Sequence, residues 1–184
     1  MKYLAIHPSD LSTEFLKPIY QNIPNVTVIT GGMSKQEVIK ELEQNDHIIM
    51  CGHGSPSGLF AISQFTGLGY MSYIIDSEVV DIFKGKQITS IWCYAKDFIV
   101  NNSISNCLMS EMFVSECAEA SMMGFQASQE QVDESNWCFS KNLGEHILKT
   151  PEEIYTAMQN GAYAKLAETN PVASYNFKRF GYRL

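Results

Sequence analysis

Two residues capable of chemistry, His53 and Cys93, each follow a short apolar run, and forty residues separate them. The first run, residues 47–52, leads into Gly-His-Gly, and the second, residues 88–93, ends on the cysteine. Such runs, bounded by turn-forming residues, are typical of buried strands in a parallel sheet. In open α/β sheets, reactive groups gather beyond the carboxyl ends of the strands. The sequence therefore predicts an imidazole and a thiol at one sheet edge, the minimum for cysteine nucleophile chemistry.

The glycines on either side of the histidine favour a functional role over a structural one. Gly52 and Gly54 let the backbone approach a ligand closely and adopt conformations closed to other residues. A histidine at a strand end is otherwise often a hydrogen-bonded structural residue, and a lone cysteine is more often an inert buried thiol. The two together, at equivalent strand ends, carry more weight than either alone.

The elements around these runs predict an α/β domain with helices and sheet in three layers. Capping boxes at residues 34–37 and 150–153 mark two helix starts. A small hairpin is expected after the His-Gly pair, from residues 59–62 and 70–75. The other expected helices cover 78–83, a segment ending near residue 119, and 134–148; the expected strands cover 3–6, 26–30, 47–52, 88–93 and 121–125.

Length, composition and charge limit the number of domains, the partners and the location that we expect for this chain. With 184 residues and 45% hydrophobic content, the chain is expected to form a single domain over 1–184, with an aromatic and basic tail at 171–184 packed on its body. The net charge of −7 argues against nucleic-acid partners and a polybasic membrane surface. Five cysteines without CxxC pairs and no apparent signal peptide indicate a cytoplasmic protein.

The two runs resemble the caspase-like clan of cysteine peptidases, which includes caspases, gingipains, metacaspases, separases and bacterial CHAT domains. The likeness lies in residues 48–54 and 88–93, an apolar strand into His-Gly and another into Cys, and it extends over roughly residues 3–166, closest to CHAT-type and gingipain-like domains. It implies a caspase-like sandwich with a mostly parallel central sheet flanked by helices. It also implies an endopeptidase that acts on a peptide or protein substrate and needs no cofactor.

Carried over from the clan, Cys93 is the nucleophile and His53 is the general base and acid. The backbone N–H groups of Gly54 and Cys93 form the oxyanion hole, where such donors can lower a barrier by ~3 kcal/mol. A neighbouring imidazolium lowers a thiol pKa, so Cys93 is expected to be partly exposed with thiolate character near neutral pH.

The residues around the nucleophile depart from the clan. Trp92 stands where a small residue is usual, and residues 94–96 lack the usual Gly or Ser. A catalytically degenerate caspase-like module for binding or signalling is therefore the main alternative. Strand alternation is expected to turn the Trp92 ring to the face opposite the Cys93 side chain, which leaves the cleft open.

Substrate preference and metal binding stay open at this stage. Asp10 and Asp97 are candidate carboxylates for a basic P1 side chain, the residue before the cut, and Trp137 is a candidate pocket wall. Because Cys51 and His53 share a strand face and Cys93 lies near, a metal-binding α/β protein is a second alternative, although no fourth ligand is evident.

Overall fold

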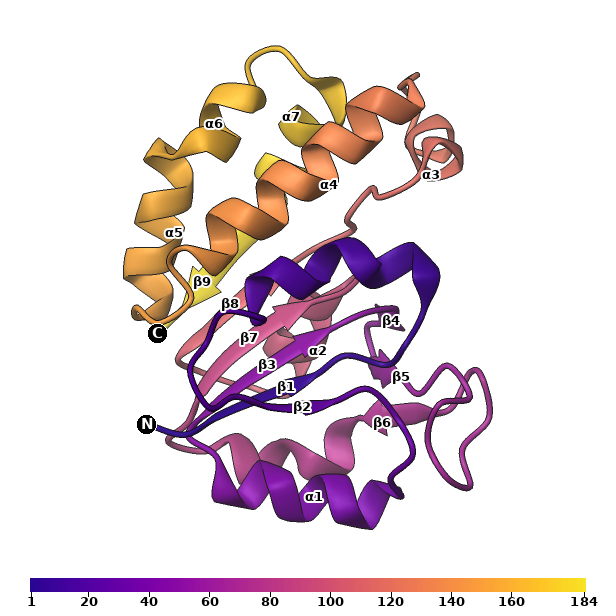
Figure 1. Ribbon diagram of the computed structural model, residues 1–184, viewed down its shortest axis with the longest axis vertical. Helices are drawn as coiled ribbons and strands as arrows, with labels where there is room; N and C mark the ends of the chain where they lie inside the picture. Colours follow the sequence, from indigo (N-terminus) through magenta and orange to yellow (C-terminus); the bar gives the residue numbers. More distant parts are fainter.

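The computed structural model describes residues 1–184 and is built on a six-stranded sheet with the order β2-β1-β3-β7-β8-β9 (Figure 1). Neighbouring strands are parallel except β9, which pairs antiparallel with β8 at one edge. The predicted α/β class with a mostly parallel sheet is confirmed. The strands are β1 (Tyr3–Ile6), β2 (Thr27–Ile29), β3 (His47–Cys51), β7 (Gln87–Ile91), β8 (Cys107–Ser110) and β9 (Phe180–Arg183).

Helices pack on both faces of the sheet, as Figure 1 shows for α1 on one side and α4 to α7 on the other. Successive strand residues point to opposite faces: Leu4 and Ile6 enter one core and Ala5 enters the other. The first core is covered by α1 (Lys35–Gln44), η2 (Ser77–Phe83) and α2 (Ala95–Asn101); the second by η1 (Leu11–Ile19), α4 (Gln129–Gly144), α5 (Pro151–Asn160), α6 (Ala162–Leu166) and α7 (Pro171–Phe177).

A second, three-stranded antiparallel sheet follows the His-Gly pair, as expected for the small hairpin. It consists of β4 (Gly54–Ser55), β5 (Gly58–Phe60) and β6 (Tyr73–Ile75). Since β4 begins one residue after His53, this sheet holds the C-terminal side of the histidine turn.

Residues 107–125 differ from the sequence-based expectation. The expected helix ending near residue 119 is wrong because β8 occupies Cys107–Ser110, and the expected strand at 121–125 is wrong because the helix α3 runs over Cys117–Met122. All four residues of β8 are buried. Periodicity cannot separate so short a strand, buried on both faces, from a piece of helix.

Both predicted capping boxes are confirmed. The side-chain oxygens of Ser34 and Thr150 accept the backbone N–H groups of Glu37 and Glu153, whose carboxylates accept the N–H groups of Ser34 and Thr150 in return. The start of α4 at Gln129, instead of residue 134, follows a third capping box that begins at Ser128. No helix is both long enough and apolar enough to cross a membrane.

Candidate active site

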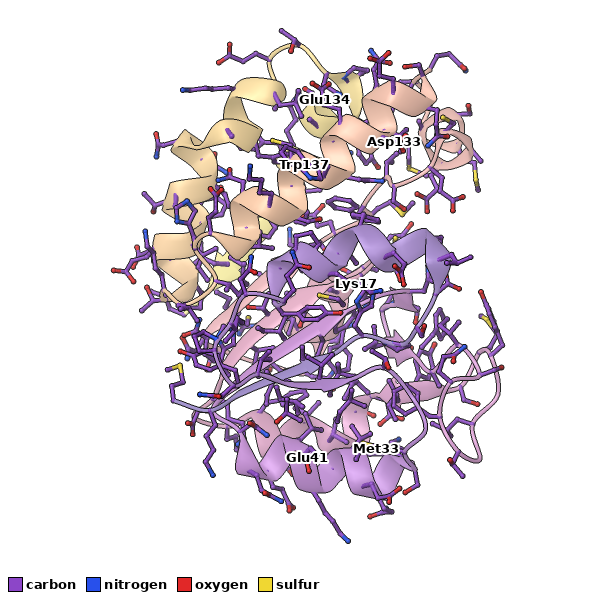
Figure 2. The ribbon with its side chains drawn as sticks, in the orientation of Figure 1. Lys17, Met33, Glu41, Asp133, Glu134 and Trp137 are labelled. Carbon is purple, nitrogen blue, oxygen red and sulfur yellow. The ribbon has the colours of Figure 1, made fainter.

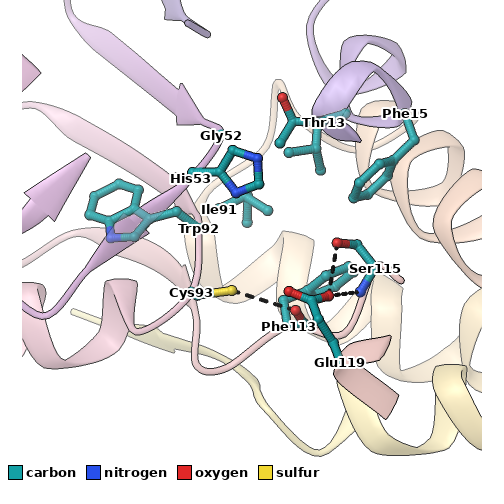
Figure 3. A pocket seen from close by; sticks show the side chains of 11 residues that line it. Thr13, Phe15, Gly52, His53, Ile91, Trp92, Cys93, Phe113, Ser115 and Glu119 are labelled. Atoms are coloured by element: carbon teal, nitrogen blue, oxygen red, sulfur yellow. Dashed lines mark hydrogen bonds between the residues drawn. The ribbon is translucent and has the colours of Figure 1, made fainter. Parts of the chain in front are cut away.

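The register of β3 and β7 brings His53 and Cys93 to one level of the sheet edge. Cys51 pairs with Ile91 in this parallel register, and His53 and Cys93 each lie two residues further along. Neighbouring strands lie about 4.8 Å apart. Figure 3 shows the imidazole and the thiol on two sides of one pocket.

The pocket between them is a small cavity of about 20 Å³ with mostly apolar walls. The His53 side chain is 35% exposed, and Cys93 is half-buried. The lining residues come from η1, the two strand ends, and the segment after β8: Thr13, Phe15, Leu16, Gly52, His53, Ile91, Trp92, Cys93, Phe113, Ser115 and Glu119.

The outer nitrogen of His53 contacts a serine and an aspartate near the start of η1. His53 Nε2 lies 2.8 Å from Ser12 Oγ and 3.5 Å from Asp10 Oδ1. The Ser12 hydroxyl and the Ser12 backbone N–H both donate to Asp10 Oδ1. Hydrogen bonding from Ser12 holds the pKa of Asp10 below its usual range. Asp10, a candidate for the P1 pocket, thus lies behind the histidine and does not line the pocket.

The Cys93 thiol is protonated in the free protein. Its S–H donates to the carbonyl oxygen of Phe113 at a sulfur–oxygen distance of 3.5 Å. Burial raises the pKa of Cys93 to about 11, and the charge of Glu119 acts in the same direction. The expectation of a thiolate near neutral pH is therefore wrong for this state of the site.

Trp92 points away from the Cys93 side chain, as strand alternation predicts. Its ring is 2% exposed and packs in the opposite core, with its centroid 5.7 Å from that of Phe98. The indole N–H donates to the carbonyl oxygen of Ser55 at 3.2 Å. A Cβ atom added at Gly54 would lie 2.1 Å from Trp92 Cδ1. The tryptophan thus packs directly against the turn that carries the histidine.

The two backbone N–H groups expected to bind an oxyanion, those of Gly54 and Cys93, belong to the two segments that the Trp92 contact joins. Gly54 begins β4, and Cys93 follows β7 outside every helix and strand. The Cys93 N–H donates no hydrogen bond within the protein. It is therefore free to bind an oxygen placed beside the thiol.

Asp97 and Trp137 are not part of this pocket. Asp97 is exposed in the first turn of α2. Trp137 is 57% exposed on α4, with the ammonium of Lys141 4.6 Å from its ring centroid (Figure 2). Trp137 is therefore a surface residue that neither lines this pocket nor packs in the core.

Glu119 is a lining residue that the sequence analysis did not find. Its carboxylate accepts the Ser115 backbone N–H at 2.7 Å and the Ser115 hydroxyl at 3.1 Å (Figure 3). These bonds fix it in the pocket that holds the thiol. No local signal could have identified it, because its place depends on β8 and α3, which the sequence analysis assigned differently.

A second, larger hollow of about 500 Å³ adjoins the first and shares Phe15 and Ser115 with it. Its lining includes the carboxylates of Glu116 and Asp133, and no Lys or Arg lines either hollow. The linings of the two hollows together therefore carry three carboxylates and no lysine or arginine to balance them.

No three His, Cys, Asp or Glu side chains are grouped so that they could hold a metal ion. Cys51 is fully buried within the second core, whereas His53 faces the pocket.

Comparison of the chain with protein-family models, with curated proteins and with solved structures finds no match.

Proposed function

We propose that this protein is a caspase-like cysteine endopeptidase in which Cys93 attacks a peptide carbonyl and His53 transfers the proton. One observation carries the proposal: equal register places the two residues at the ends of neighbouring strands, where they line the same pocket. The caspase-like assignment is supported by the motifs at residues 48–54 and 88–93 and by a mostly parallel sheet whose last strand is antiparallel.

In the proposed reaction the thiol proton passes to His53 while Cys93 Sγ bonds to the peptide carbonyl carbon. The N–H groups of Gly54 and Cys93 stabilise the oxyanion. The C–N bond then breaks, and the imidazolium gives its proton to the leaving amine. Water, deprotonated by His53, hydrolyses the thioester and restores the thiol. Because the S–H is directed to Phe113 in the free protein, substrate must first displace that contact.

We further propose a basic residue at P1. The support is the Glu119 carboxylate in the pocket beside the thiol, the acidic groups of the adjoining hollow, and the absence of Lys and Arg from both linings. The stem of a lysine or arginine in the larger hollow would lie against Phe15, which lines both hollows, while its charged end reaches a carboxylate.

The test is an assay of the wild type and Cys93→Ala on a peptide library with Arg, Lys or Asp at P1. We expect cleavage after Arg or Lys that falls by several orders of magnitude in Cys93→Ala, since nucleophile and base act as one unit. Cys107→Ala is a matched control, because Cys107 is buried in the first core. Cleavage that persists in Cys93→Ala would refute the proposal.

The alternative is a caspase-like module that binds a basic peptide without cutting it. The observation in its favour is the protonated thiol, which donates to Phe113 and has a raised pKa. Binding of an Arg- or Lys-containing peptide by calorimetry, with no product by mass spectrometry from either the wild type or Cys93→Ala, would support this alternative.

A further inference from the structure

We propose that Ser12 is a positioning residue that, together with Asp10, fixes the tautomer of His53 and leaves Nδ1 as the proton-transferring nitrogen. The inference deepens the proposed peptidase function and rests on it for its catalytic consequence. Its structural basis is independent: a chain of short contacts runs from Asp10 Oδ1 through Ser12 Oγ to His53 Nε2.

Asp10 and His53 are linked through the Ser12 hydroxyl, because the direct distance between the carboxylate and the imidazole is too long for a hydrogen bond. The 3.5 Å between Asp10 Oδ1 and His53 Nε2 exceeds the usual 2.7–3.2 Å of an N–H···O bond, whereas the 2.8 Å to Ser12 Oγ lies within it. Asp10 therefore acts on the imidazole mainly through the serine.

The direction of each hydrogen bond follows from counting protons. A hydroxyl has one hydrogen, and an ionised carboxylate can only accept. The lowered pKa of Asp10 keeps it ionised at neutral pH, so the Ser12 hydrogen points to Asp10. Ser12 Oγ must then accept from His53, which requires a proton on Nε2. In the neutral imidazole Nδ1 is therefore unprotonated and can accept the proton of the thiol.

The backbone holds this chain of groups in place. Asp10 is the N-cap of η1 and accepts the Ser12 N–H at 2.9 Å, which fixes the serine relative to the carboxylate. The Thr13 hydroxyl donates to the Asp10 carbonyl at 3.2 Å. Asp10 and Ser12 therefore hold their positions beside His53 before substrate binds, as residues that orient a catalytic group must.

The test uses the proton spectrum of the full chain, with the imidazole N–H signals of His53 assigned by their loss in His53→Gln. We expect a hydrogen-bonded Nε2–H signal in the wild type and in Ser12→Thr, which keeps the hydroxyl. The signal should be lost in Ser12→Ala. Ser9→Ala, an exposed serine of the same loop, is the matched control and should keep it. A wild-type proton on Nδ1, or a Ser12→Ala spectrum like that of the wild type, would overturn the inference.

Kinetics supply the second readout. Ser12→Ala should lower kcat by about 10- to 100-fold with KM nearly unchanged, because orientation of the base and not binding is lost. Asp10→Asn should act similarly while keeping the helix cap, since Asn caps helices as well as Asp. Full activity in Ser12→Ala contradicts the inference. If no variant cleaves peptide but the Nε2–H signal depends on Ser12 as expected, the peptidase proposal fails and the positioning role stands.

Discussion

At Cys93, burial and a neighbouring carboxylate act together against the thiolate. The largest cause of its raised pKa is loss of solvent, and the charge of Glu119 adds to it. A basic side chain beside Glu119 would neutralise one of these causes. The proposed substrate class would therefore favour the charge state that the chemistry needs.

The first prediction concerns the reactivity of this thiol. With a pKa of about 11, labelling of Cys93 by iodoacetamide should rise about tenfold per pH unit above neutrality, because the thiolate is the reacting form. Mass mapping of peptides labelled over a pH series measures this. Glu119→Gln should speed labelling near neutral pH. A rate that already levels off at neutral pH would contradict the assigned environment.

The second prediction concerns specificity and rests on the proposed function. Glu119→Gln should lower kcat/KM for Arg or Lys at P1 by about 10- to 100-fold, the loss expected for one charge-assisted contact. Gln can still accept the Ser115 N–H, so the start of α3 is kept. Glu130→Gln, an exposed residue of α4, should have no effect. An equal loss for neutral P1 residues would assign Glu119 a structural role only.

At the scale of elements, the contact between β4 and the end of β7 explains the glycine after His53. Besides Trp92 Cδ1, a Cβ atom at Gly54 would meet the Gly58 carbonyl oxygen at 2.6 Å. Trp92, the bulky residue before Cys93, and Gly54, the small residue after His53, therefore pack against each other.

The third prediction follows from that contact. Gly54→Ala should destabilise the protein by about 1–3 kcal/mol, the usual cost of overpacking, measured by urea unfolding. Gly181→Ala in β9 is the control, since a Cβ atom there meets nothing within 4 Å. Equal stability of the two variants would mean that Trp92 moves aside freely.

The sequence predicted those elements that carry a strong local signal. The strands that end before His53 and Cys93 are five-residue runs made mostly of apolar or β-branched residues, and the capping boxes at Ser34 and Thr150 mark helix starts by hydrogen bonds between near neighbours. β8 could not be recognised, because only its pairing with β7 and β9 distinguishes it from a helix segment. Ser12 and Glu119 were missed for the same reason: long-range packing decides what they contact.

At the scale of the whole molecule, two buried histidines link stability to pH. Burial lowers the pKa of His7 and that of His47 to about 4 each. His7 contacts the hydroxyls of Tyr20 and Thr13, while His47 Nε2 contacts the Thr89 hydroxyl and its Nδ1 has no partner. Both rings are therefore neutral in the folded state.

The fourth prediction is the resulting acid sensitivity. The unfolded chain binds two more protons than the native state between pH 6.5 and about 4, so the free energy of unfolding should fall with decreasing pH across that window. The limiting slope is about 2.7 kcal/mol per pH unit for two protons. Urea unfolding at several pH values measures it, and His47→Gln should halve it. A stability independent of pH from 6.5 to 4 would contradict the assignment.

The two tryptophans lie in opposite environments, so quenching can distinguish their fluorescence. Trp137 is exposed, whereas Trp92, the residue before the thiol, is buried against the turn that carries His53. In Trp137→Phe all indole fluorescence should come from Trp92 and resist quenching by acrylamide, while Trp92→Phe should leave an emission that is quenched readily. The emission of the first variant would then report, without any label, on the packing of the turn that carries His53.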